Sequence, residues 1–314
     1  MNIKEAILWG FEQLTPTSDS PRVDAELLLA HVLKKSTTFL FTHDEQKISS
    51  FLDYPWLRTD QVARNDKFFE PQFFNLWRYR RLIQKRKRGI PVAYLVGHKE
   101  FYLLDFKVNR HVLVPRPDTE TLVEAAVEYI HKTKGEDFNP RQRDLEIAPS
   151  VVLVDVGTGS GCIPISILKN VPDLRAIATD ISWRALRVAK ANARKHHVED
   201  RLQFVWSDLL DNVDTTEFED TEVILTANLP YLPDKMEVKP ELTFEPSISL
   251  YGGSDGMDVY KKFVQQLVRI RPKAIFLELY EWQIAQLQTH LQGYELKYAK
   301  IMSGEARVLA LERQ

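Results

Sequence analysis

Four consecutive residues, Asn228 to Tyr231 (Asn-Leu-Pro-Tyr), combine groups that could hold a flat NH2 group in place for a reaction. The side-chain oxygen of Asn228 and the carbonyl of Leu229 or Pro230 can accept the two hydrogens of an amide or a nucleobase amine. Pro230 has a fixed φ that stiffens the turn, and the Tyr231 ring can stack on a flat group. We therefore expect Asn228, Pro230 and Tyr231 to be catalytic, and Asn228, Leu229, Pro230 and Tyr231 to bind the substrate.

A glycine-rich turn lies well upstream, from Asp155 to Gly161 (Asp-Val-Gly-Thr-Gly-Ser-Gly), directly after the apolar segment Val151 to Val154. Glycines at such a point let the backbone turn tightly and approach a ligand at the carboxyl edge of a sheet. The third glycine comes one residue earlier than in the dinucleotide fingerprint G-x-G-x-x-G, which favours S-adenosylmethionine over NAD. The expected cofactor contacts in the turn are Gly157, Thr158, Gly159, Ser160 and Gly161.

Further cofactor contacts are expected where later strands end. Asp180 is placed to accept hydrogen bonds from a ribose diol. Asp208 could bind an adenine amino group, or it could cap the turn that follows it. Leu209 and Ile181 could enclose the adenine ring, or they could be ordinary core residues. With Asn228 also expected to touch the cofactor, these residues together predict a methyltransferase.

The elements that must position these residues alternate between strand and helix. This alternation predicts an α/β, Rossmann-like S-adenosylmethionine-dependent methyltransferase domain over residues 119–314. Its predicted helix 120–130 and later segments are 151–156, 163–169, 176–179, 183–196, 203–205, 223–227, 259–268 and 274–278, followed by a terminal strand pair, 294–301 and 306–312. The polar stretch 133–150 is predicted to be a surface loop.

The first 90 residues show helical spacing of apolar residues and predict a small N-terminal helical bundle. Its expected role, which the spacing does not itself indicate, is recognition of the substrate. Ser20 and Pro21 are expected to open its second helix as a cap followed by a first-turn proline. Residues 91–118 are expected to form a β-hairpin linker, with strands 101–108 and 112–114 joined by Asn109 and Arg110. The aromatic-rich segment 51–74 predicts only short helices.

The composition narrows the class of protein. The 314 residues are 44% hydrophobic and 27% charged, with a net charge of -2, which is typical of a globular protein. The single cysteine, Cys162, excludes internal disulfides and is interpreted as a small buried packing residue. No secretory signal or membrane-length apolar run is visible, so we expect a cytoplasmic monomer with no metal, no membrane association and no stable nucleic-acid partner. The basic run 78–88 is interpreted as a solvated helix face, with contact to an acidic partner or RNA as the alternative.

At this point the chain resembles a known family, the release-factor glutamine N5-methyltransferases (the HemK family), over nearly its whole length. The segments that carry the resemblance are 20–31, 91–97, 100–102, Pro115 to Glu120 (Pro-Arg-Pro-Asp-Thr-Glu), 244–246, 250–256 and Tyr260, together with the two motifs above. The resemblance implies methyl transfer to the glutamine amide in the Gly-Gly-Gln loop of a peptide-chain release factor. It places Gly157 to Gly161, Asp180 and Leu209 at the donor, and Asn228 to Tyr231 at the glutamine. We expect a direct in-line displacement in which positioning does most of the work.

The chain departs from the family pattern in three places. Leu229 stands where the family usually has proline, Leu279 and Tyr280 stand where Ile-Gly is common, and the residues after Ile301 differ from the usual ending. Three alternatives follow. Adenine N6-methyltransferases of ribosomal RNA often carry Asn-Leu-Pro-Tyr, a ribosomal-protein glutamine methyltransferase is a closer relative, and a non-catalytic binding protein could retain the same scaffold.

Overall fold

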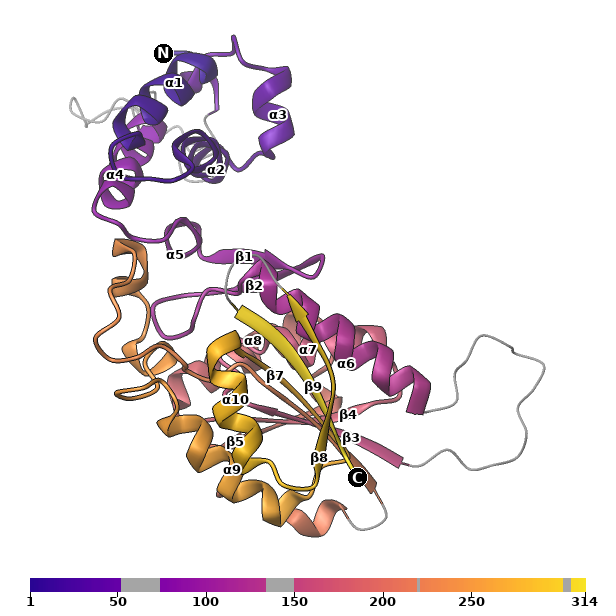
Figure 1. Ribbon diagram of the computed structural model, residues 1–314. Coiled ribbons are helices and arrows are strands. Elements are labelled where there is room, and N and C mark those ends of the chain that lie inside the picture. The colour runs from indigo at the N-terminus through magenta and orange to yellow at the C-terminus, as the bar shows by residue number, and fades with distance from the viewer. Residues whose placement is uncertain (52–73, 134–149, 219–220, 302–305) are drawn as a thin grey trace. The chain divides into compact units, whose positions relative to one another are not determined.

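The computed structural model describes residues 1–51, 74–133, 150–218, 221–301 and 306–314 (Figure 1). Contacts within it define two compact units, one of residues 1–97 with 239–244 and the other of residues 98–238 with 245–314. The short helices predicted for 51–74 and the loop predicted for 133–150 lie almost wholly outside the described residues. Among the residues that are described, no helix is both long enough and apolar enough to cross a membrane.

The first unit contains the helical bundle that its apolar spacing predicts. Its helices are α1 (Ile3–Leu14), α2 (Pro21–Leu33), α3 (Thr37–Thr42), α4 (Phe74–Lys87) and α5 (Val92–Val96), with a 3-10 turn at Ile48–Ser50. Tyr79 is fully buried and its hydroxyl donates to the Ala6 carbonyl at 3.2 Å, which ties α4 to α1. Pro21 opens α2 as predicted, but the Ser20 side chain makes no capping bond. The Ser18 hydroxyl lies there instead, accepting from the Ser20 amide and donating to Asp24.

One member of the predicted basic run is buried rather than solvated. Arg86 is 3% exposed, and its Nε donates to Asp24 at 2.6 Å while its Nη2 pairs with Glu241, from the 239–244 part of the same unit. A buried guanidinium without such partners would be costly, so the two carboxylates allow the arginine into the core. The run is therefore not a uniformly solvated face, although Arg80, Arg81 and Arg88 are exposed.

The second unit is a doubly wound α/β fold, as predicted. Within the described residues its main sheet has seven strands in the order β5-β4-β3-β6-β7-β9-β8, with only β8 and β9 antiparallel to their neighbours. Because β3 has β4 on one side and β6 on the other, the strand order reverses there, where ligands bind in such folds. The strands are β3 (Ser150–Val156), β4 (Arg175–Asp180), β5 (Leu202–Trp206), β6 (Thr221–Ala227), β7 (Ala274–Tyr280), β8 (Tyr294–Ile301) and β9 (Ala306–Arg313).

Helices cover both faces of this sheet, and each face has its own apolar core (Figure 1). One core includes residues of α6 (Glu120–Thr133), α7 (Cys162–Asn170) and the end of α8 (Trp183–Lys195). The other includes α9 (Asp258–Ile270) and α10 (Glu281–His290). The strands alternate their side chains between the two cores, so the sheet is buried on both sides and its carboxyl edge is held rigidly.

The hairpin after the bundle uses different strands from those predicted. β1 (His98–Phe101) pairs with β2 (Leu104–Lys107), and the turn is made by Tyr102 and Leu103, with φ of 49° and 60°. Two successive left-handed residues suit a tight hairpin, but such turns are usually Asn-Gly or Asp-Gly. Because Tyr102 and Leu103 are not typical turn residues, the sequence did not indicate a turn here. The predicted strands 101–108 and 112–114 are therefore wrong. Val112–Val114 forms no strand, and Val112 and Leu113 instead line the cavity described below.

Candidate active site

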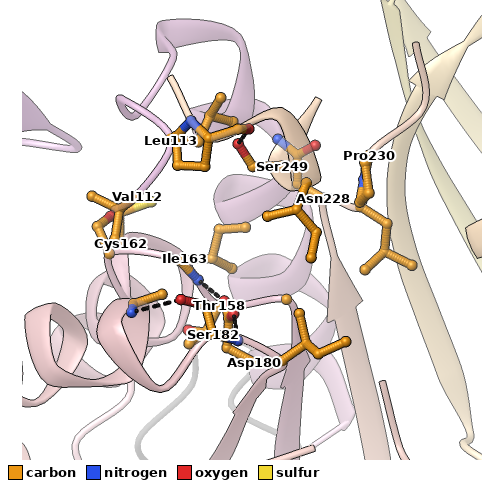
Figure 2. Close-up of a pocket in the computed structure, with 18 of the residues that line it drawn as sticks. Val112, Leu113, Thr158, Cys162, Ile163, Asp180, Ser182, Asn228, Pro230 and Ser249 are labelled. Carbon is orange, nitrogen blue, oxygen red and sulfur yellow. Dashed lines mark hydrogen bonds between the residues drawn. The ribbon is translucent and has the colours of Figure 1, made fainter. Parts of the chain in front are cut away.

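A cavity opens at the carboxyl ends of β3, β4 and β6, next to the point where the strand order reverses. Figure 2 shows Thr158, Asp180 and Ser182 in one part of it and Asn228 and Pro230 in another. We call the first part the glycine side, formed by Gly157–Ser160, Asp180, Asp208 and Leu209. The second is the asparagine side, formed by Thr119 and Asn228–Pro230. The fold thus brings most predicted site residues together, while Gly161 and Tyr231 are not among the lining residues.

Backbone geometry builds the glycine side. Gly157, Gly159 and Gly161 all have left-handed φ, at 71°, 56° and 80°. A Cβ added to Gly159 would meet nothing closer than the Gly157 carbonyl at 4.0 Å, so this backbone lies bare beside the cavity. Gly161 instead turns the chain into α7, where an added Cβ would lie 3.0 Å from Ile165 and 3.2 Å from Ala189. Its contribution is therefore to packing beneath the turn.

Asp180 is fixed by backbone amides. Its Oδ2 accepts from the Gly159 amide and its Oδ1 from the Ser182 amide, both at 2.8 Å. Burial raises the pKa of this carboxyl, and the two amide hydrogen bonds oppose that rise. Each carboxylate oxygen has a second lone pair, so Asp180 can still accept from a hydroxyl in the cavity. This arrangement suits the ribose role expected for it.

The remaining residues of the glycine side line the cavity but also have other contacts or roles. Asp208 lines the cavity, but its carboxylate also pairs with Lys262 at 2.5 Å. Leu209 is buried and Ile181 is 47% exposed, and both line the cavity. The bare glycine backbone and the carboxylates of Asp180 and Asp208 together fit a nucleoside-bearing cofactor.

The asparagine side depends on side chains rather than backbone. Asn228 is half-buried, and its Nδ2 donates to Thr119 Oγ1 at 3.2 Å. Thr119 lies in the short 3-10 helix Pro117–Thr119 and donates its hydroxyl to Glu278 Oε2 at 2.7 Å. No partner of Asn228 Oδ1 is found among the described residues, so this oxygen stays free for a ligand.

The other residues of the Asn-Leu-Pro-Tyr segment play separate parts. The Leu229 side chain is 2% exposed and packs in the core, where a Cβ on Gly157 would lie 3.0 Å from it. Pro230 lines the cavity. The Tyr231 hydroxyl donates to Glu278 Oε1 at 3.4 Å, and its ring meets Tyr280 edge-on at 5.1 Å. Stacking of Tyr231 on an acceptor stays a prediction.

Glu278 is one of the residues at this site that the sequence patterns did not predict. It is 3% exposed at the end of β7, and burial raises its pKa to about 7, against the lowering effect of its bond to Thr119. Gln283 of α10, also missed, donates from Nε2 to the Tyr231 carbonyl at 2.9 Å. A lone carboxylate in the otherwise apolar strand Ala-Ile-Phe-Leu-Glu-Leu-Tyr was the signal that could have identified Glu278.

A second buried carboxylate holds the segment that leads to Thr119. Glu245 Oε2 accepts from the Val114 amide at 2.9 Å, and its Oε1 pairs with Arg116, which lines the cavity. Cys162 is buried as predicted, and burial raises the pKa of its thiol to about 12, which keeps the thiol neutral. The Cys162 side chain therefore packs beside the cavity and does not act as a nucleophile.

Two family models match the chain. Residues 5–51 match the PrmC N-terminal domain, and residues 143–235 match the methyltransferase small domain. The second match spans both the glycine turn and the Asn-Leu-Pro-Tyr segment. The two matches therefore agree with a helical unit and a methyltransferase unit in the same chain.

Relatives match over most of this length. A release factor glutamine methyltransferase of Koribacter versatilis is 33% identical over 91% of this chain and 88% of its own. One of Coxiella burnetii is 31% identical over 100% of this chain and 99% of its own. A bifunctional methyltransferase of Rickettsia bellii is 33% identical over 77% of this chain but only 41% of its own, so the chain spans about half the length of such bifunctional relatives.

Among solved structures, the catalytic domain of human METTL16, in complex with an RNA hairpin, superposes with a TM-score of 0.51. It covers 71% of this chain and 80% of that domain at 13% identity. At this identity the likeness concerns the fold alone, and it agrees with a Rossmann-like methyltransferase unit.

Proposed function

Because the chain belongs to the family of release factor glutamine methyltransferases, we propose that it methylates N5 of the glutamine in the Gly-Gly-Gln loop of a peptide-chain release factor. S-adenosylmethionine is the proposed methyl donor, and its site is the glycine side of the cavity. The proposed partner acts in translation, which gives the enzyme a cytoplasmic location.

The observation that supports this proposal best is the orientation of the Asn228 carboxamide. Its NH2 group is bonded to Thr119, so Oδ1 is left to accept a hydrogen from an acceptor NH2. A backbone carbonyl of Leu229 or Pro230 would accept the second hydrogen. Holding both hydrogens keeps the planar nitrogen in one orientation, and such positioning accounts for much of the rate in reactions of this kind.

Other residues of the chain bind the proposed donor. Gly157–Ser160 bring bare backbone to the cavity, Asp180 offers carboxylate oxygens to a ribose, and Asp208 offers one to an adenine amino group. When bound, S-adenosylmethionine supplies an electrophilic methyl group. No side chain has to act as a strong base, because a methylated amide cation loses its proton readily to water.

The ribosomal RNA alternative rested on Leu229, which stands where glutamine methyltransferases usually have proline. In the structure the Leu229 side chain is buried in the core, although Leu229 is among the residues that line the cavity. This burial supports a packing role for the leucine side chain rather than a role in choosing the acceptor.

Transfer of a radiolabelled methyl group tests the proposal directly. Purified release factor, ribosomal RNA and ribosomal proteins are each incubated with the enzyme and labelled donor. We expect label in the release factor, and loss of that label when the loop glutamine is changed. Label in adenine of the RNA, or in a ribosomal protein alone, would assign the enzyme to one of the alternative functions.

A further inference from the structure

The side-chain carboxamide of Asn228 has nearly the same shape at its two ends but opposite hydrogen-bonding character. Oδ1 accepts hydrogen bonds and Nδ2 donates them. A half-turn about the last side-chain bond would exchange the two groups without changing the space that they fill. The end that faces the cavity therefore decides which chemical group the asparagine side can hold.

Thr119 settles this orientation. A hydroxyl has one hydrogen, and Thr119 donates it to Glu278 Oε2 at 2.7 Å. While Glu278 is ionised, the Thr119 oxygen can only accept from its neighbour at 3.2 Å, so that neighbour is the NH2 group of Asn228. With Nδ2 held by Thr119, Oδ1 points away from that contact.

Glu278 is held in place by burial and by hydrogen bonds. Its side chain is buried at the end of β7, and the Tyr260 hydroxyl donates to its main-chain carbonyl at 2.6 Å. Its carboxylate reaches both ends of the Asn-Leu-Pro-Tyr segment, because Thr119 and Asn228 bond to it at one end and Tyr231 at the other. One fixed carboxylate thus orients the whole segment.

We propose that Thr119 and Glu278 are positioning residues that fix the Asn228 carboxamide with its oxygen toward the cavity, and so make the site select a carboxamide over a carboxylate. This inference rests on the proposed function. A glutamine presents an NH2 donor to that oxygen, whereas a glutamate presents oxygens, which an acceptor repels. A site that is built to pair with one hydrogen-bonding group rejects an analogue that lacks it.

Two substitutions at one position test the inference. Thr119→Val keeps the shape of the side chain but removes the hydroxyl, and Thr119→Ser keeps the hydroxyl and serves as the matched control. Calorimetry measures the Kd of each enzyme for purified release factor and for the same factor with glutamate in place of the loop glutamine, with S-adenosylhomocysteine present. Thermal melts show whether both variants fold.

We expect wild type and Thr119→Ser to prefer the glutamine form, and Thr119→Val to lose about tenfold of that preference, because its carboxamide can turn over. Equal weakening of both forms in Thr119→Val, with the preference kept, would mean that Thr119 only supports the local structure. A preference that is unchanged in every respect would also overturn the inference. Failure of wild type to bind either form would instead reject the proposed function, and the inference with it.

Discussion

The two sides of the cavity are built in different ways. The glycine side is made by a continuous turn, whose backbone faces the cavity and whose main partner, Asp180, is held by two amides of nearby residues. The asparagine side depends on the side chains of Thr119 and Asn228, from two separate segments, and Glu278 of a third segment bonds to Thr119 outside the cavity lining. Backbone can cradle many nucleosides, whereas a hydrogen-bonded set of side chains can recognise one functional group. The donor and acceptor sites can therefore be damaged separately.

Asn228→Ala should have the largest effect. It removes the oxygen that orients the acceptor and leaves the glycine side intact. We expect methyl transfer in single turnovers to fall by roughly 10²- to 10³-fold, as for loss of one orienting group at an active site. Donor affinity, measured by calorimetry, should change little. Near-normal transfer would exclude Asn228 from the mechanism.

Gly252→Ala should disturb the asparagine side indirectly, by crowding the backbone of Pro230. An added Cβ would lie 2.4 Å from the Pro230 carbonyl and 2.6 Å from that of Gly256. Overpacking of this kind costs about 1 to 3 kcal/mol of stability. We expect it to displace the Pro230 carbonyl, so transfer should fall several-fold while donor affinity holds.

Gly293→Ala is the control for this change, because a Cβ there meets nothing within 4 Å. Its left-handed backbone gives it some strain, but it makes no contact with the cavity segment. An equal loss of transfer in both variants, or a parallel loss of donor binding in Gly252→Ala, would show that the two sides are not independent.

The pair Gly161→Ala and Gly159→Ala tests a packed position against an open one within the glycine turn. Both place an L side chain in left-handed backbone, which costs about 1 to 2 kcal/mol. Only Gly161→Ala also crowds Ile165 and Ala189. We expect Gly161→Ala to have the lower melting temperature by roughly 2 to 4 °C for each additional kcal/mol.

Donor titrations should rank the two variants the other way. If the bare Gly159 backbone contacts the donor, Gly159→Ala should lose more donor affinity than Gly161→Ala. Gly159→Ala would then lose more donor affinity than its melting temperature suggests. Identical melting temperatures for the two variants would mean that the packing beneath Gly161 relaxes freely.

The smallest effect concerns pH. Burial raises the pKa of Glu278 from an ordinary 4.5 to about 7, so the folded state binds more protons than the unfolded state between these values. The stability linked to this group is present below pH 4.5 and is lost as the pH rises through about 7. Glu278→Gln removes the titration, so its melting temperature should fall less than that of wild type between pH 5 and pH 8.

Asp155 provides the internal reference for this experiment. Burial raises the pKa of Asp155 to about 7 as well, and its Oδ1 accepts from Thr226 at 2.7 Å, away from the substituted position. Part of the pH dependence should therefore remain in the variant. Equal slopes in the two proteins would mean that Glu278 does not titrate in this range.

The same contrast explains what the sequence could predict. The glycine turn, Asp180 and the Asn-Leu-Pro-Tyr segment were predicted because each is a short local pattern at a strand end. Glu278 was not, because it lies far from Asn228 in sequence, on a strand that only the fold brings near it. Thr119 was singled out only within the segment Pro115 to Glu120, which the family resemblance places near the donor, and its bond to Asn228 was not predicted. The helix α10 was also missed, because Tyr280 both ends β7 and caps α10, with no turn residue between them.

The pairing of β3 with β6 has a consequence for how this protein can vary. The two strands run in register from Ser150 opposite Thr221 to Val156 opposite Ala227, so Gly157 and Asn228 leave the sheet on the same rung. Neighbouring strands lie about 5 Å apart, so their pairing sets the spacing between the glycine turn and Asn228. Insertions or deletions inside either strand would therefore misalign the glycine turn with Asn228.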